Sequence, residues 1–352
     1  MTYRVVQWSI GNVGRNTLAG IVARPDLELV GCYTSSAAKA GTDAGTLAGL
    51  AETGVQATND AEALLSLRPD CVVYTSMADT RIFEALDDLA RILRAGINVV
   101  SSAPVFLQFP DGSMDGPIRE AAAEGGASIW VNGIDPGFAN DWLPLSLTSI
   151  SERIDQVRCL EVLNYATYDQ GTVLFDIMGF GRALDDLPFL LQPGILTLAW
   201  GSVVRQIAAG LGVELDSIEE AHTRLPAPEP FDIRAGRIEK GTTAALRFEV
   251  RGLLNGRPVI VLEHVTRLRD DLGPDWPQPA GQGCYRVEVT GEPNYTLDLQ
   301  LLGADGDHNT AGLKATAMRL VNAIPAVIAA PPGLLTALDL PLITAHGLLP
   351  RA

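Results

Sequence analysis

The feature that most constrains the fold is a regular alternation of short apolar runs and helix-length segments over residues 1–135. The segments between the runs carry apolar residues at helical spacing. The strand-like runs are Tyr3–Ser9, Leu27–Tyr33, Cys71–Ser76, Asn98–Ser102 and Ser128–Asn132, and the helical segments are 12–24, 61–67, 82–95 and 118–124. Strand and helix units that alternate in this way build a parallel sheet with helices on both faces. We therefore predict an α/β domain for residues 1–135.

The pattern changes after Asp135. A strand over Ile154–Tyr168 and a helix over Leu196–Leu211 come first. Four more strand-like segments then follow one another, at 244–253, 258–268, 285–292 and 295–302. Asn255 and Gly256 form a hairpin turn between the first two of these segments. Consecutive strands predict a second domain of α+β type, with a mostly antiparallel sheet, over residues 136–308. A last helix over Ala311–Ile324, ending at Pro325, opens a C-terminal segment at 309–352.

The turn after the first strand, SIGNVG at 9–14, follows the glycine-rich fingerprint of a Rossmann dinucleotide-binding loop at two of three positions. Gly11 stands where backbone must approach the pyrophosphate, and Gly14 where the helix packs closely on the strand. Ser9 replaces the first glycine. The helix that follows offers free N–H groups to phosphate. We predict cofactor contacts from Ser9, Ile10, Gly11, Asn12, Val13, Gly14 and Arg15.

The end of the second strand indicates which dinucleotide is bound. An acidic residue about 20 residues beyond the glycines holds the ribose of NAD. This chain has CYTSSAAK at 32–39, with hydroxyl groups and a lysine but no carboxylate. These groups suit a 2′-phosphate, so NADP(H) is predicted to be preferred over NAD(H); the alternative is a plain polar loop. The residues concerned are Thr34, Ser35, Ser36 and Lys39.

Two further strands end in small or hydroxyl residues. Ligands of an open parallel sheet lie beyond the carboxyl ends of its strands. We expect the residues that follow these strands to line the ribose and the nicotinamide, although strands often end in Ser or Thr for no such reason. They are Thr75, Ser76, Met77, Ser101, Ser102 and Ala103. Gly137, after the last strand of the first domain, is expected to let backbone approach the nicotinamide or the substrate.

Three segments resemble the dihydrodipicolinate reductase-like proteins, in the branch of 2,4-diaminopentanoate dehydrogenase and the native amine dehydrogenases. They are VVQWSIGNVGR (5–15), NGIDPGFANDWLP (132–144) and VNAIPAVIAAPPGLLTALDLPLI (321–343). The resemblance implies a Rossmann domain, an α+β domain for substrate and dimerisation, and a C-terminal segment that packs back on the Rossmann domain. It also implies NAD(P)H-dependent reduction of C=N or C=O bonds by a homodimer.

The chain departs from this pattern in its acid and base residues. The amine dehydrogenases carry a glutamate just after the strand at Asn98–Ser102, where this chain reads SSAPVFLQFP and has no acidic residue before Asp111. The lysine and histidines of the dihydrodipicolinate reductases fall within Leu160–Gly171, where this chain has neither residue type. The proton-transferring residue must therefore lie elsewhere.

Polar residues in the second domain are the candidates for proton transfer. Tyr168, with Asp169 to orient it, is the first choice because a phenol can donate a hydrogen bond to a developing alkoxide or amine. Asn164 is a further candidate. His264, on a predicted strand, is also a candidate, although a histidine on a strand more often has a structural role. No group of residues has the spacing of a metal site.

Apolar residues are plentiful in the segments near these positions and either line the cleft or belong to the core; they are Val105, Phe106, Leu107, Phe109, Trp142, Phe175, Met178 and Phe180. We therefore expect an NAD(P)H-dependent oxidoreductase that reduces a small, fairly hydrophobic carbonyl or imine. One alternative is an amine dehydrogenase, reductively aminating ketones with ammonia, that works without the usual glutamate. The other is a non-catalytic NADP(H)-binding sensor or subunit.

Composition supports this class of protein. The net charge of −16 argues against nucleic acid and anionic membrane surfaces as partners. With 47% hydrophobic and 19% charged residues, the chain can bury a large core. Charged residues and prolines interrupt the apolar stretch 313–349, so it does not read as a membrane span. The four cysteines form no C-x-x-C pair and are expected to be reduced, as in a cytoplasmic protein.

Overall fold

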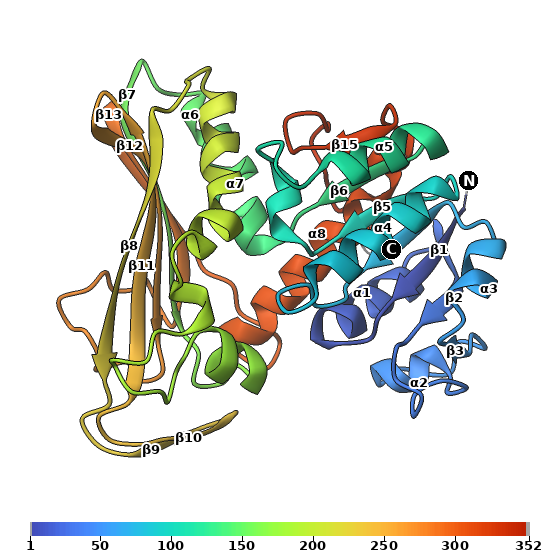
Figure 1. The fold of residues 1–352 in the computed structure, drawn as a ribbon, viewed down its shortest axis with the longest axis horizontal. Coiled ribbons are helices and arrows are strands. Elements are labelled where there is room, and N and C mark those ends of the chain that lie inside the picture. The colour runs from blue at the N-terminus through green and yellow to red at the C-terminus, as the bar shows by residue number, and fades with distance from the viewer. Residues whose placement is uncertain (1, 350–352) are drawn as a thin grey trace. The chain divides into compact units, whose positions relative to one another are not determined.

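The computed structural model describes residues 2–349, and the chain divides into two compact units (Figure 1). Unit 1 runs to Ile134 and resumes at Leu313, and unit 2 comprises Asp135–Gly312. The last helix begins in unit 2 and continues into unit 1. None of the helices described between residues 2 and 349 is long and apolar enough to cross a membrane.

Unit 1 contains a seven-stranded sheet in the order β15-β6-β5-β4-β1-β2-β3, and every pair of neighbours is parallel. Strands such as CVVY in β4 are apolar throughout because they are buried on both faces. This confirms the predicted Rossmann-type parallel sheet. Its strands are β1 Tyr3–Trp8, β2 Leu27–Tyr33, β3 Ala57–Thr58, β4 Cys71–Tyr74, β5 Asn98–Ser101, β6 Ser128–Val131 and β15 Gly333–Leu335. Its helices are α1 Asn12–Val22, α2 Ala44–Ala48, α3 Ala61–Ser66, α4 Ile82–Arg94 and α5 Gly116–Gly125.

The prediction that the last helix ends at Pro325 is wrong, since α8 spans His308–Ala329 and carries Pro325 inside it. A proline within a helix removes one backbone hydrogen bond and costs about 3 kcal/mol. Val321, Ile324 and Val327 on either side of it are fully buried in the core of unit 1. Burial of this apolar face offsets the local cost, so the helix continues beyond the proline to Ala329.

Unit 2 is built on a six-stranded sheet in the order β14-β13-β7-β12-β11-β8. Only β7 and β12 pair in parallel, so the prediction of a mostly antiparallel sheet is confirmed. One face packs against α7, through Val203, Val204 and Ile207. The strands are β7 Arg153–Asn164, β8 Ser217–Pro226, β11 Thr243–Leu254, β12 Arg257–Arg267, β13 Cys284–Glu292 and β14 Tyr295–Leu299, and the helices are α6 Trp142–Thr148 and α7 Ile195–Gly210.

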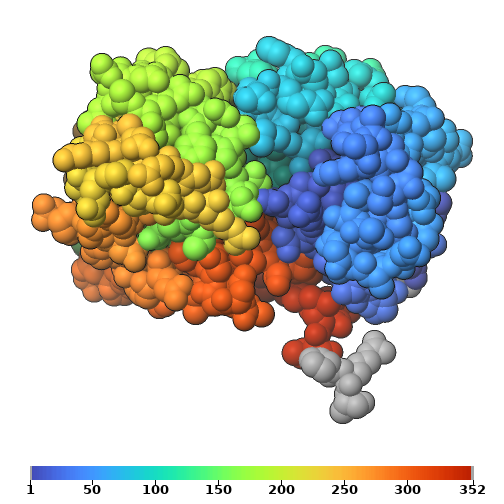
Figure 2. All heavy atoms as spheres, turned by 90° about the horizontal axis from the view of Figure 1, so that it is seen from below, coloured from blue at the N-terminus to red at the C-terminus, as the bar shows by residue number. Residues whose placement is uncertain are grey.

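Several strand boundaries in unit 2 differ from the prediction. β7 ends at Asn164, and the chain turns so that the Tyr168 N–H donates to the Tyr165 carbonyl. The predicted strand end at Tyr168 is therefore wrong. The strand predicted at 295–302 ends at Leu299. β8 has no apolar alternation because it is an edge strand with polar residues on both faces. The hairpin of β9 Phe231–Ile233 and β10 Gly236–Ile238, yellow in Figure 2, lies at the surface.

Candidate active site

The turn between β1 and α1 in unit 1 has the backbone geometry that its sequence predicts. Ser9, in place of the first glycine, has φ 77°, in the left-handed region that glycine adopts freely. A Cβ on Gly14 would lie 2.3 Å from the Ser9 carbonyl oxygen, so only glycine fits there. A Cβ on Gly11 would meet nothing within 4 Å. Gly14 thus serves packing, and Gly11 faces open space.

The start of α1 suits a bound pyrophosphate. Gly11 is the N-cap residue and no side chain caps the helix, so the positive end of the α1 dipole faces the turn, where it would attract a phosphate. Asn12, Val13 and Arg15 lie in this first turn, and the Arg15 N–H already bonds to the Gly11 carbonyl. Open space at Gly11 beside a helix start without a side-chain cap fits the phosphates of a nicotinamide dinucleotide.

The residues after β2 form a polar turn. Thr34 is buried, and its hydroxyl accepts a hydrogen bond from the Ser36 N–H at 3.2 Å. Ser35 is exposed. The ammonium group of Lys39 lies 3.4 Å from the Ile10 carbonyl oxygen, so this positive charge stands beside the phosphate-binding turn.

The residues after β4 and β5 differ in what they offer a ligand. The Thr75 hydroxyl lies 3.2 Å from the Ser9 carbonyl oxygen and is therefore part of the turn. Ser101 is fully buried, and its hydroxyl binds the backbone of Ala103. Its side chain therefore shapes the chain locally. The neighbouring predicted residues are Ser76, which is buried, Met77, which is exposed, and Ser102, which is half-buried.

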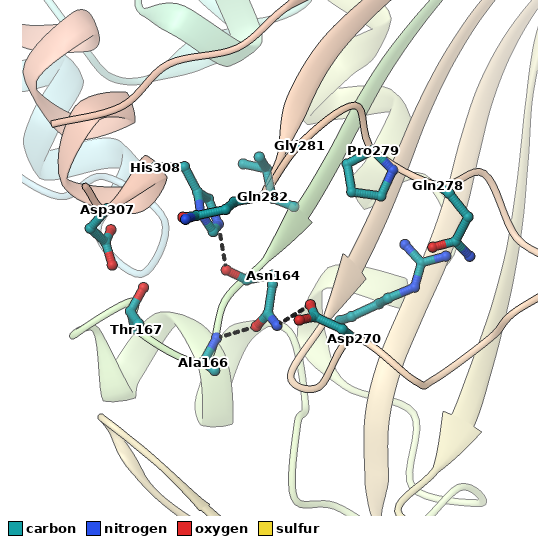
Figure 3. A pocket seen from close by; sticks show the side chains of 12 residues that line it. Asn164, Ala166, Thr167, Asp270, Gln278, Pro279, Gly281, Gln282, Asp307 and His308 are labelled. Carbon is teal, nitrogen blue, oxygen red and sulfur yellow. Dashed lines mark hydrogen bonds between the residues drawn. The ribbon is translucent and has the colours of Figure 1, made fainter.

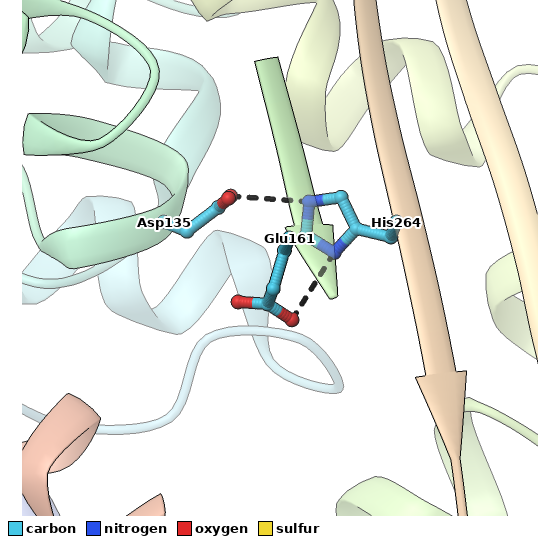
Figure 4. A group of neighbouring side chains, drawn as sticks. All are labelled: Asp135, Glu161 and His264. Carbon is cyan, nitrogen blue, oxygen red and sulfur yellow. Dashed lines mark ion pairs between the residues drawn. The ribbon is translucent and has the colours of Figure 1, made fainter. Parts of the chain in front are cut away.

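A second constellation lies in unit 2, where the imidazole of His264 stands between two carboxylates (Figure 4). Its Nε2 is 3.2 Å from Asp135 Oδ1, and its Nδ1 is 3.4 Å from Glu161 Oε1. The contact with Asp135 is an ion pair rather than a well-aligned hydrogen bond. Glu161 on β7 and His264 on β12 are directly paired in the sheet, so both point to the face that packs against α7. All three side chains are at most 5% exposed.

Aromatic side chains surround this cluster, and two of them donate hydrogen bonds to its carboxylates. Trp200 Nε1 donates to Asp135 at 2.9 Å, and the Tyr165 hydroxyl donates to Glu161 at 2.8 Å. Phe248 stacks on the imidazole with ring centroids 4.6 Å apart. Burial, reinforced by the charge of Glu161, raises the pKa of Tyr165 well above its usual range, so its phenol stays protonated. The unused lone pairs of the cluster belong to carboxylates, which only accept hydrogen bonds.

Burial alone would lower the pKa of His264, but the adjacent Asp135 and Glu161 raise it to about 10. This bears on the metal that the cluster might hold, since the three side chains offer ligand atoms within 4.8 Å of one another. A metal ligand must be a deprotonated imidazole. Here both ring nitrogens face carboxylates, and the ring is protonated at neutral pH. The donor set suits an imidazolium between two anions better than a metal ion.

The raised pKa of His264 predicts a pH-dependent stability. The folded state keeps the proton up to about pH 10, whereas an unfolded histidine loses it near its ordinary value of 6.5. The contribution to the free energy of unfolding is therefore complete below pH 6.5 and is lost as the pH rises toward 10. Urea titrations across this range should show a steeper decline for the wild type than for His264→Gln. Parallel declines would contradict the assignment.

Of the other predicted catalytic residues, Tyr168 packs on the aromatic shell of the cluster, whereas Asp169 and Asn164 contact residues outside it. Tyr168 is half-buried and packs on Tyr165, with ring centroids 4.9 Å apart. Asp169 is exposed and lies 3.5 Å from Arg234 of the surface hairpin. The Asn164 amide donates to Asp270 at 2.6 Å and lines a separate pocket of about 580 Å³ (Figure 3). Gly137 has φ 150°, and its N–H donates to Asn140.

Sequence reasoning named His264 but missed Asp135, Glu161 and Trp200 as its partners. A signal was present, since Glu161 interrupts the buried series Val157, Cys159 on one face of β7. His264 interrupts the matching series on β12 in the same way. No local pattern shows that these two residues are neighbours, because the parallel pairing of β7 with β12 joins residues about a hundred positions apart.

Comparisons with known proteins agree with this architecture. Residues 138–348 match the family described as 2,4-diaminopentanoate dehydrogenase C-terminal domain. The chain is 42% identical to an amine dehydrogenase of Streptomyces virginiae, over 98% of both chains. It is 25% identical to the 2,4-diaminopentanoate dehydrogenase of Acetoanaerobium sticklandii, over 77% of this chain and 74% of that protein.

A solved structure of an amine dehydrogenase from Mycobacterium smegmatis has the same fold. Its TM-score is 0.79 at 24% identity, with 98% of this chain and 97% of that chain covered. The chain therefore belongs to the 2,4-diaminopentanoate dehydrogenase and amine dehydrogenase branch of the dihydrodipicolinate reductase-like proteins, and it is an NAD(P)-dependent oxidoreductase.

Proposed function

We propose that the enzyme is an amine dehydrogenase that prefers NADP(H) and acts on a small, mostly apolar primary amine. A protonated amine, oxidised cofactor and water become a carbonyl compound, ammonium, reduced cofactor and one released proton. The turn at 9–14 would hold the nicotinamide dinucleotide, which would supply the acceptor for the hydride on the carbon that bears nitrogen. The name of the 42% identical relative supports this reaction class.

The observation that carries the proposal is the chemistry of the cluster Asp135, Glu161 and His264. Two carboxylates flank one imidazolium, which leaves an excess of negative charge among aromatic rings. Such surroundings favour a cationic nitrogen. A carbonyl oxygen needs a donor, and both imidazole nitrogens, Trp200 Nε1 and the Tyr165 hydroxyl already face carboxylates. The cluster is therefore better suited to an ammonium group or an iminium ion.

Within this reaction we assign Glu161 as the base. The substrate ammonium must lose a proton before its nitrogen can support hydride loss from the neighbouring carbon. Glu161 accepts that proton, and Tyr165 orients the carboxylate through its hydrogen bond. The ring of His264 holds Glu161 from the other side, with 3.4 Å between His264 Nδ1 and Glu161 Oε1. Glu161 then supplies the function that the missing glutamate after β5 has in the amine dehydrogenases.

The cofactor preference rests on the turn after β2. The next carboxylate along the chain, Asp43, accepts hydrogen bonds from the backbone of Thr46, Thr53 and Gly54 and caps α2. It is therefore committed to its own loop. Ser35 and Lys39 are the groups that would bind a 2′-phosphate.

Replacing Lys39 tests this preference. Lys39→Ala should raise the Kd for NADPH about tenfold, because a charge-assisted contact to phosphate is worth roughly 1.5–3 kcal/mol. The Kd for NADH should change less than about twofold. Lys240→Ala removes an equal charge from an exposed site in unit 2 and serves as the control. Equal losses for both nucleotides would contradict the role of Lys39.

Two further properties belong to the proposal. We infer a homodimer, on the resemblance of the sequence to the amine dehydrogenases, and sedimentation equilibrium of the purified chain tests it. We also infer a cytoplasmic location, supported by the cysteines of the described chain, which are all unpaired and buried.

The reaction class is tested by reducing a small ketone with NADPH in the presence and absence of ammonium chloride. An amine dehydrogenase consumes NADPH only when ammonium is present and forms the amine. Equal consumption without ammonium would instead identify a carbonyl reductase.

A further inference from the structure

A buried polar network lies under the phosphate-binding turn. Gln7 is fully buried on β1, yet each polar atom of its amide has a partner. Its amide nitrogen, Nε2, donates to the Ser9 carbonyl oxygen at 2.8 Å and to the Thr75 hydroxyl at 2.9 Å. Its Oε1 accepts from the Thr17 hydroxyl on α1 at 2.6 Å. One side chain therefore joins β1, α1 and the end of β4.

The network contacts the turn at Ser9, the residue whose backbone conformation is unfavourable. Ser9 has φ 77°, a conformation that disfavours residues with a Cβ. In this conformation the Ser9 carbonyl points toward Gln7 and lies against Gly14, where no Cβ would fit. If Ser9 relaxed to a negative φ, its carbonyl would leave this position, and the Gln7 amide would lose a buried partner.

We propose that Gln7 is a positioning residue for the dinucleotide: its amide holds the Ser9 carbonyl and so keeps the turn in the shape that a glycine at position 9 would adopt without help. Gln7 acts through Ser9. The inference concerns cofactor binding in unit 1 and does not depend on the amine chemistry proposed for unit 2.

A double-mutant cycle tests this role, with calorimetric titration of NADPH into the purified enzyme. Gln7→Met keeps the length of the side chain but removes both donors, and it should raise the Kd about tenfold, or about 1.4 kcal/mol. Ser9→Gly alone should change the Kd less than about twofold. In the Gln7→Met/Ser9→Gly double variant, the Kd should return to within about threefold of the wild type, because glycine needs no support at this φ.

A merely structural role for Gln7 would give a different pattern. If Gln7 acts by positioning, turnover of Gln7→Met at saturating NADPH equals that of the wild type. Thr17→Val leaves both Gln7 donors in place and should bind NADPH nearly as the wild type does. A folded Gln7→Met protein with wild-type affinity overturns the proposal, and so does a Ser9→Gly change that fails to restore affinity. If Gln7→Met does not fold, Thr75→Val is used instead, because the Thr75 hydroxyl also donates to the Ser9 carbonyl, and restoration of the affinity by Ser9→Gly then decides the outcome.

Discussion

Glu161→Gln should lower kcat about 1,000-fold while leaving the Kd for NADPH unchanged. Glutamine has the same shape as glutamate but cannot accept the proton, and general base catalysis contributes roughly 100- to 10,000-fold to a rate. The cofactor turn lies in unit 1, whereas Glu161 contacts His264 and Tyr165 in unit 2. The effect should therefore fall on the chemical step, measured as single-turnover formation of NADPH with a primary amine as substrate.

The matched control is Glu249→Gln. Glu249 is also largely buried on the same sheet, but it lies on the opposite face and is paired with Arg158 and Arg251. This substitution should lower the free energy of unfolding and leave kcat within about twofold, since these arginines do not contact the cluster. Similar losses of kcat in both variants would mean that Glu161 acts only through the stability of the sheet.

Gly11→Val should raise the Kd for NADPH at least about 100-fold and leave the fold intact. The backbone at Gly11 is extended, with φ −91° and ψ −162°, which valine adopts readily. A Cβ there would meet no protein atom within 4 Å, so the valine side chain would extend into the space that the phosphates need. Losing two charge-assisted hydrogen bonds from backbone N–H groups accounts for an effect of this size. Titration of Trp8 fluorescence measures it, because Trp8 stacks on Tyr33 below the turn.

The control for Gly11→Val is Gly116→Val. Gly116 also stands at the beginning of a helix with no atom near its would-be Cβ, but it is the first residue of α5. Both variants should unfold at nearly the same temperature as the wild type, and only Gly11→Val should lose NADPH. Wild-type affinity in folded Gly11→Val would show that the phosphates do not bind at this turn.

Local patterns in the sequence predicted the fold class but not the grouping of the charged residues. The parallel sheet of unit 1 followed from apolar runs such as CVVY, since strands buried on both faces need no alternation. The turn at Ser9 followed from two glycines with distinct steric roles. β8 escaped detection because an edge strand can be polar on both faces. Helix α8 passed Pro325 because burial of Ile324 and Val327 outweighed a local penalty.

The charged cluster could not be assembled from the sequence for a different reason. His264 has meaning only beside Glu161 and Asp135, and these residues come from a strand, a distant parallel strand and an irregular segment. Tyr168 and Asp169 are adjacent in sequence, yet the structure places Tyr168 against Tyr165 and Asp169 beside Arg234 at the surface. The printed contacts of the two residues therefore lead in different directions, and their joint role stays a prediction.

The most direct test of the central claim compares a primary amine with the alcohol of the same carbon skeleton, each offered to the wild-type enzyme with NADP+. We expect the amine to produce NADPH, with stoichiometric release of ammonium, and the alcohol not to react. Formation of NADPH from the alcohol, at a rate equal to or above that from the amine, would contradict it and identify the cluster around His264 as a site for oxygen rather than nitrogen.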